Sequence, residues 1–454
     1  MRKGCLGRML LLALWALAAA PASAASLAEL AEEAAARSGG REAMAARTRE
    51  AEAASREARL RRLPALSARV TAARADDPVY AFGARLRQRV LASEDLALER
   101  LNRPGYRTSL ESSLELGVPL FTAFELETQE RLGQLAAGQA RHGESGETQQ
   151  ARWRVAEAYL AAAAKSGALA AARARIRLAA EDVAAAKRLT LRGLVLGSDQ
   201  LAAEAILEGL RAWAESLQGE LEAERASLGA LTGRPAGELE LTGRLGEPSY
   251  AVPPAEALAR EGARRRPDVG SARLSSEAAA AAARQAKWSL LPRAEAFASL
   301  ESDSGGLGAF PSSRRVGARL WVPFGDPGFL ARRRRTEEAA AVRRADERRI
   351  SEAAALELAR AFAGYRAAAA SLGPLKAMKA NAAAAAEAFR PLYREGRRSV
   401  LEALRAHEAA ARAEAAYLDA AAEAHASYAR LLLAAGALDA GPVAEISRSL
   451  EAAR

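Results

Sequence analysis

The spacing of apolar residues changes from a helical to an alternating period at two corresponding places in the chain. Leu63-Pro64 and Leu291-Pro292 lie 228 residues apart, and the segments that precede them align without gaps. Each of these segments, 26–62 and 254–289, is predicted to be one helix of about 35 residues that ends where proline stops it. This self-similarity predicts two structural repeats within one chain.

Alternation of apolar and polar residues follows each Leu-Pro pair and predicts β-strands. It is clearest over 108–120 in the first half, and it covers 293–300 and 315–324 in the second half. We therefore expect two strands joined by a loop in each half. Strands that are apolar on one side and polar on the other occur in half-buried sheets and in membrane barrels. The pattern is therefore consistent with a soluble hairpin packed on the helices and with the wall of a membrane barrel.

A long helix is predicted after each pair of strands. Phe121 and Gly193 are 72 residues apart, and so are Phe324 and Gly396. An unbroken helix of that length would reach about 110 Å. Glycine adopts the left-handed conformation that often ends helices, so Gly193 and Gly396 predict chain reversals. The polar residues expected to cap the two returning helices are Ser198, Asp199 and Ser399.

The returning helices complete the predicted division into domains. Residues 25–232 form the first repeat, which consists of a helix, a β-hairpin and a pair of long helices. A segment rich in glycine and proline, 233–253, is predicted to be an equatorial linker. The second repeat has the same elements over 254–436, and residues 437–454 remain as a C-terminal tail.

Residues 1–24 have the pattern of a secretory signal peptide. Arg2, Lys3 and Arg8 form a positively charged segment that precedes an apolar run over 9–20. Ala22-Ser23-Ala24 then gives a small-x-small cleavage site. The run is short for a permanent membrane anchor. The only cysteine, Cys5, lies in this segment, so we expect neither a disulfide nor thiol chemistry in the mature chain.

The composition gives little support for binding nucleic acid or for catalysis. The 66 Lys and Arg residues against 56 Asp and Glu residues give a formal net charge of +10, and an exported chain of this mild charge is not expected to bind nucleic acid. The sequence contains no phosphate-binding Gly-Lys-Ser/Thr loop and no dinucleotide fingerprint. His407 and His425 would lie about 27 Å apart on one helix, too far to share a metal ion. We therefore predict no enzyme activity, no catalytic residue, no cofactor and no metal site.

Four arginines, 332–335, follow the second predicted hairpin. Two interpretations stay open: a belt of charge below a membrane interface, or a positive ring in a lumen that favours anionic solutes. The carboxylates close to these arginines, Glu337 and Glu338, are expected to form solvated ion pairs.

The order and spacing of several motifs resemble the TolC-type outer membrane efflux proteins over essentially the whole mature chain. The matching segments are 77–86 with 101–104, 266–269 with 291–292, and 393–396 with 399–404. One departure is visible at Ser38-Gly39-Gly40, where the family normally has an Asn-Pro pair. These glycines are expected to loosen the first helix without changing the topology.

The resemblance implies a mainly α fold with a small β-barrel. Long antiparallel helices would form a hollow α-barrel, and four strands per chain would close a 12-stranded barrel in a homotrimer. Three chains are implied by the family, whereas the need for oligomers also follows from the open strand edges that lipid does not tolerate. The implied location is the cell outer membrane, in contact with its lipid, with the helices extending into the periplasm.

The implied function is that of a passive exit duct in a tripartite efflux or type I secretion system. Such a duct would receive substrate from a periplasmic adaptor (membrane fusion) protein and an inner-membrane pump. The alternative is a periplasmic coiled-coil scaffold or adaptor that forms no pore. The sequence does not identify the cargo, which could be a drug, a metal ion or a polypeptide, with small molecules or metal ions favoured.

The resemblance also implies two groups of site residues at the reversals. The first would dock the adaptor, and its members are Arg192, Gly193, Leu194, Val195, Gly396 and Ser399. The second would close a gate through polar links between neighbouring inner helices, and its members are Ser198, Asp199, Tyr393 and Arg398. In the alternative interpretation Asp199 only caps its helix and Arg398 faces solvent. Glu402 keeps an acidic position of the family, but Arg405 replaces a second carboxylate, so an acidic double ring is expected to be incomplete.

Overall fold

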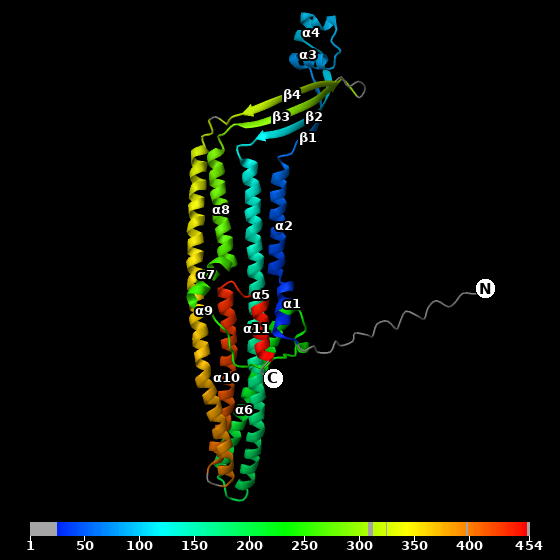
Figure 1. The fold of residues 1–454 in the computed structure, drawn as a ribbon. Helices are drawn as coiled ribbons and strands as arrows, with labels where there is room; N and C mark the ends of the chain where they lie inside the picture. The colour runs from blue at the N-terminus through cyan, green and yellow to red at the C-terminus, as the bar shows by residue number, and fades with distance from the viewer. Residues whose placement is uncertain (1–24, 307–311, 324, 396–397, 452–454) are drawn as a thin grey trace, which may run out of the picture. The chain divides into compact units, whose positions relative to one another are not determined.

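The computed structural model describes residues 25–306, 312–323, 325–395 and 398–451 (Figure 1). The predicted signal peptide, Phe324 and Gly396 lie outside the described residues. The chain forms two compact units. The helical unit comprises Met1–Met44, His142–Gly270 and Ile350–Arg454, and the sheet unit comprises Ala45–Arg141 and Ser271–Arg349.

Helices make up most of the described chain. They are α1 (Leu27–Arg37), α2 (Gly39–Leu60), α3 (Pro78–Arg87), α4 (Leu98–Asn102), α5 (Glu125–Thr190), α6 (Gly197–Thr232), α7 (Ala255–Arg265), α8 (Pro267–Trp288), α9 (Phe329–Arg394), α10 (Val400–Ala434) and α11 (Ala440–Glu451), with 3₁₀ turns η1 (Ser93–Leu96) and η2 (Ala236–Glu238). The strands are β1 (Ala65–Ala75), β2 (Arg107–Phe121), β3 (Arg293–Ser304) and β4 (Ser312–Trp321).

Three pairs of helices in the two repeats have equal lengths. Helices α1 and α7 each have 11 residues, α2 and α8 each have 22, and α5 and α9 each have 66. The prediction of one continuous helix before each hairpin was wrong, because a residue outside the helical conformation interrupts both. Arg266 is extended, as expected for a residue before proline, and Ser38 precedes the two glycines that were expected to loosen the first helix.

The reversals differ in how the returning helix begins. Helix α6 begins at Gly197 after Leu196, which provides no side-chain cap, so the prediction that Ser198 and Asp199 cap this helix was wrong. Both residues lie in its first turn, where the Asp199 carboxylate interacts favourably with the helix dipole. Helix α10 is capped as predicted: the Ser399 hydroxyl accepts a hydrogen bond from the backbone N–H of Leu401, with a donor–acceptor distance of 3.2 Å.

The sheet unit contains one antiparallel sheet in the order β1-β2-β3-β4. Its register places apolar residues opposite one another on all four strands, as in the row Leu66, Leu116, Ala298 and Val316. The neighbouring row of the other face is polar and contains Ser67, Glu115, Ser299 and Arg315. The predicted alternation therefore corresponds to two chemically different faces of one sheet.

The two ends of this sheet, taken along the strand direction, adjoin different elements of the sheet unit. Figure 1 shows α3 and α4 beyond the end at which β2 begins, whereas α2, α5, α8 and α9 adjoin the opposite end. Pro119 lies close to that opposite end, and the register between β2 and β3 shifts between Pro119 and Phe121. A proline has no N–H for the ladder, which accounts for the irregularity.

The core of the helical unit is built largely from small side chains. Alanine occupies most of the buried positions of α10, and larger residues such as Tyr159 and Leu160 of α5 fill the wider spaces. The segment predicted only as a tail contains α11, which contacts α1 and α10. Its apolar face is buried through Val443, Ile446 and Leu450. None of the described helices has a stretch long and apolar enough to cross a membrane.

Candidate functional site

The α5–α6 reversal, residues 191–196, exposes a cluster of leucines. Gly193 has a φ of +72°, and the backbone N–H of Leu194 donates to the Leu189 carbonyl at 3.0 Å, which closes the helix end in a Schellman-type turn. The side chains of Leu191, Leu194 and Leu196 are 84%, 71% and 69% exposed. A regular turn thus holds an apolar surface in solvent, which is a common feature of protein contact sites.

The other predicted docking residues surround this surface or lie at the second reversal. Arg192 and Gly193 are exposed, and Val195 is half-buried. Ser399 is half-buried because its side chain and backbone both take part in the α10 cap. Gly396, the remaining predicted docking residue, lies outside the described residues.

Within one chain, the four predicted gate residues form no hydrogen bond or ion pair with one another. The Arg398 guanidinium pairs with Glu402, with an N–O distance of 3.1 Å, and Ser198 is exposed in the first turn of α6. Tyr393 is only 4% exposed and packs in a cluster that includes Val400. The structure shows no contact between Asp199 and Arg398 within the chain.

A buried polar cluster next to Tyr393 joins α5, α9 and α10. The Asp182 carboxylate lies 3.2 Å from the Nε2 atom of His407 and 3.5 Å from the Nε atom of Arg390. The Asp182 and His407 side chains are 2% and 1% exposed, whereas Arg390 also pairs with Glu181 at the surface. Burial raises the pKa of the Tyr393 hydroxyl, and the negative charge of Asp182 raises this pKa further.

Sequence reasoning missed this cluster. It treated His407 only as a candidate metal ligand, and Asp182 lies 208 and 225 residues from its two partners. No local pattern marks pairs that are so far apart in the chain. The described residues contain no group of three or more metal-ligating side chains. The contacts of Asp182 instead connect α5, α9 and α10 through charge and hydrogen bonds.

A second buried histidine holds the equatorial linker. The Nε2 atom of His425 lies 3.1 Å from the Gly246 carbonyl oxygen, and its Nδ1 atom contacts the Tyr250 hydroxyl. The Tyr250 ring stacks on Tyr428 with a centroid distance of 3.8 Å. Burial lowers the pKa of His425 to about 4. The neutral imidazole thus donates to Gly246 and accepts from Tyr250.

Two of the four arginines after β4 form ion pairs at the surface of the sheet unit. Arg332 pairs with Asp326, and Arg333 lies 3.1 Å from Glu337. Glu337 also lies 3.3 Å from Lys287, and both neighbours lower its pKa, the Arg333 hydrogen bond most of all. The prediction of exposed ion pairs is confirmed for Glu337.

The comparisons with known proteins agree with this architecture. Residues 258–437 match the family model described as outer membrane efflux protein. No curated protein sequence matches the chain. Among solved structures, the chain is similar to the CmeC outer membrane channel of Campylobacter jejuni, with 15% identity, a TM-score of 0.77, and coverage of 93% of this chain and 89% of that chain.

Two further structures give the same picture. The outer membrane protein VceC of Vibrio cholerae has 17% identity and a TM-score of 0.74, with 90% of this chain and 96% of that chain covered. The open state of the MtrE outer membrane channel of Neisseria gonorrhoeae has 17% identity and a TM-score of 0.73, with 91% and 90% covered. At identities this low, the structural likeness shows a shared fold and nothing more.

The predicted family resemblance and fold class are confirmed by these findings. The three solved structures are described as an outer membrane protein and two outer membrane channels, in agreement with the predicted location. Residues 258–437 thus match the outer membrane efflux protein family, and the chain as a whole has the fold of these outer membrane channels.

Proposed function

We propose that this protein is the passive outer-membrane exit duct of a tripartite efflux or type I secretion system. The observation that carries the proposal is the sheet, in which every strand has one apolar and one polar face. Its apolar row includes Leu66 and Val316, which are 65% and 83% exposed in one chain. A lipid-facing barrel wall would cover these side chains with acyl chains.

The sheet edges support a homotrimer. Strands β1 and β4 each have one unpaired edge, and an open edge in lipid leaves backbone groups without partners. Three chains would pair β4 of one with β1 of the next and close twelve strands. Helix α9 is largely exposed as well, including Leu330 at 72% and Val342 at 57%, which fits further contact between chains.

Val316→Arg is expected to prevent stable insertion, because arginine on the lipid face of a barrel costs up to about 2–4 kcal/mol per chain. Ser313→Arg is the matched control, since Ser313 belongs to the same strand but to the polar face. Membrane fractionation and trimer content in detergent extracts measure the outcome. Equal recovery of both variants as membrane trimers would contradict the barrel assignment. Recovery of the parent protein in the soluble periplasm would favour the scaffold alternative.

The reversals support a gate between neighbouring chains as part of the same proposal. Asp199 is half-buried in the first turn of α6, and Arg398 is exposed just before the Ser399 cap of α10. The Arg398–Glu402 pair is exposed enough for Arg398 to exchange partners. A link between exposed charges contributes only about 0.2–1 kcal/mol, so an adaptor could break three such links on docking. Tyr393 would support the gate from inside through its buried ring.

Asp199→Ala and Arg398→Ser are each expected to raise the open probability of single channels in planar bilayers, because each removes one partner of the link. Arg211→Ser is the control, since it removes a comparable exposed pair with Glu208 further along α6. If the double variant Asp199→Ala/Arg398→Ser conducts like the parent, these two residues do not form a gate.

Leu194→Glu and Val195→Glu are expected to abolish adaptor-dependent efflux while leaving the trimer intact, because a charge would disrupt the apolar surface of the α5–α6 reversal. Leu98→Glu is the matched control, since Leu98 is 78% exposed on α4 of the sheet unit. Efflux assays and site-directed cross-linking to a co-expressed adaptor give the readout. Normal efflux and cross-linking by the reversal variants would exclude this surface from docking.

A further inference from the structure

The connection between β1 and β2 forms a pocket of about 210 Å³ in the sheet unit. Helix α3, turn η1 and helix α4 surround it, and β2 begins at its wall. Four of its lining residues are arginines: Arg85, Arg100, Arg103 and Arg107. Asp95 is the only acidic residue among the lining residues. The pocket wall therefore carries a large excess of positive charge.

The carboxylates close to the pocket are already engaged. Asp95, whose side chain is 7% exposed, pairs with Arg85 and accepts a hydrogen bond from the backbone N–H of Ala92 at 3.0 Å. That backbone hydrogen bond is the main cause of the lowered pKa of Asp95. Glu94, just outside the pocket, pairs with Arg100 at 3.1 Å. These two pairs hold Arg85 and Arg100 in place but leave no carboxylate for the other arginines.

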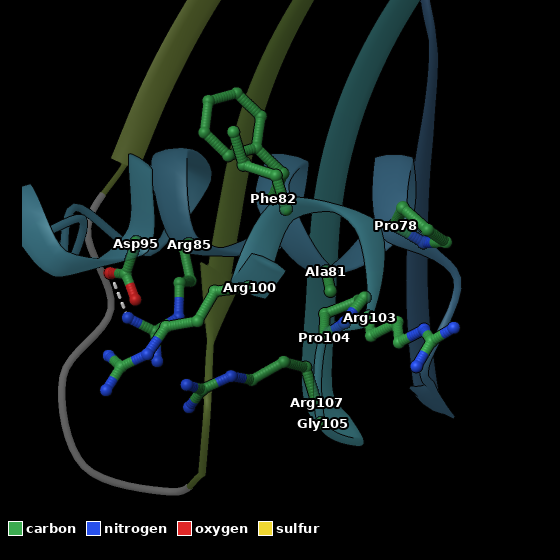
Figure 2. A pocket seen from close by; sticks show the side chains of 11 residues that line it. Pro78, Ala81, Phe82, Arg85, Asp95, Arg100, Arg103, Pro104, Gly105 and Arg107 are labelled. Carbon is green, nitrogen blue, oxygen red and sulfur yellow. Dashed lines mark ion pairs between the residues drawn. The ribbon is translucent and has the colours of Figure 1, made fainter. Parts of the chain in front are cut away.

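Among the pocket arginines, Arg107 combines partial burial with the lack of an acidic partner among the described residues. It is half-buried at the first residue of β2, and in the described part of the chain no carboxylate pairs with it. Figure 2 shows its side chain directed to the same side of the pocket as Arg85, Arg100 and Asp95, whereas Arg103 extends the other way. A partly buried cation without a counter-charge is unfavourable until an anion joins it.

We propose that this pocket binds a phosphate group, held mainly by Arg107 and assisted by Arg100. The planar guanidinium matches the oxygens of phosphate through two parallel hydrogen bonds, which makes arginine the preferred residue for this anion. Two sources share this chemistry: free phosphate, and the phosphate of a lipid headgroup. The lipid source rests on the proposed function, because only a membrane-inserted sheet would bring the pocket close to headgroups.

The test uses the purified full-length protein and two probes. In detergent, binding of inorganic phosphate is measured by isothermal titration calorimetry at low ionic strength. In nanodiscs of phosphatidylcholine with or without a bisphosphorylated glycolipid, binding of that lipid is measured by native mass spectrometry. Arg107→Gln is expected to weaken binding of the active probe about tenfold or more, as the loss of a charge-assisted hydrogen bond predicts. Arg100→Gln is expected to have a smaller effect.

Arg69→Gln is the matched control, because Arg69 is an exposed arginine of β1 that does not line the pocket. Binding of inorganic phosphate alone, or of the glycolipid alone, would each support the site and identify the source. The proposal fails if neither probe binds, or if Arg107→Gln and Arg69→Gln weaken binding equally. Phosphate binding by a protein that forms no channel would overturn the proposed function and keep the pocket.

Discussion

Asp182→Ala is expected to lower the free energy of unfolding of the helical unit by about 1–3 kcal/mol, because it leaves the buried His407 without its partner and leaves Arg390 with only the exposed Glu181. His407 is almost fully buried and Arg390 is largely buried, so water replaces little of the lost interaction. Thermal unfolding followed by circular dichroism at 222 nm, or the midpoint of urea unfolding, measures the effect.

Glu181→Ala is the matched control for this prediction. Glu181 is the neighbouring residue of α5 and pairs with the same Arg390, but its side chain is 63% exposed. An exposed pair contributes about 0–1 kcal/mol, so this variant should unfold close to the parent. Asp182→Asn, which keeps the shape and one acceptor, should lie between the two. If Glu181→Ala destabilised the protein as much as Asp182→Ala, burial would not be the cause.

His425 is expected to make the protein sensitive to acid. Its pKa is about 4 in the folded protein because of burial, against about 6.5 in an unfolded chain. The unfolded state therefore binds a proton first as the pH falls, so stability is complete above about pH 6.5 and decreases down to about pH 4. A shift of this size corresponds to roughly 3 kcal/mol for each chain.

His425→Gln should remove this part of the pH dependence. Its side-chain amide can still donate to the Gly246 carbonyl, but it does not titrate. Urea unfolding midpoints between pH 7 and pH 4 measure the slope, and His142→Gln, which changes a half-buried histidine elsewhere in the helical unit, should keep the slope of the parent. An unchanged slope in His425→Gln would show that other groups cause the acid sensitivity.

Local signals were sufficient for much of the fold. The alternation over 108–120 lies within β2, and the reversal at Gly193 has the left-handed backbone that glycine allows. The break at Arg266 had a signal that was not used, since a residue before proline avoids the helical conformation. The spacing of Val443, Ile446 and Leu450 likewise marked α11 as an amphipathic helix.

The errors at the reversals and the missed cluster have a different origin. Ser198 and Asp199 have the residue types of caps, but the turn that ends α5 sets the start of α6 at Gly197. They therefore lie two and three residues after the cap position, which Leu196 occupies. Asp182 and His407 meet only because two long helices are correctly aligned, and this alignment is a property of tertiary packing. Residue type alone carries no information about such a contact.

The equal lengths of α5 and α9 restrict how such a chain can evolve. Deleting one residue between Glu125 and Asp182 would turn everything after it by about 100° and shift it by about 1.5 Å, which would carry Asp182 out of the interior. A change close to a whole number of turns, such as about seven residues, nearly restores the facing residues, and the returning helix would have to change by the same amount. We therefore expect the lengths of these helices to change only in coordinated steps, and single insertions and deletions to be tolerated in the loops and in the 233–253 linker.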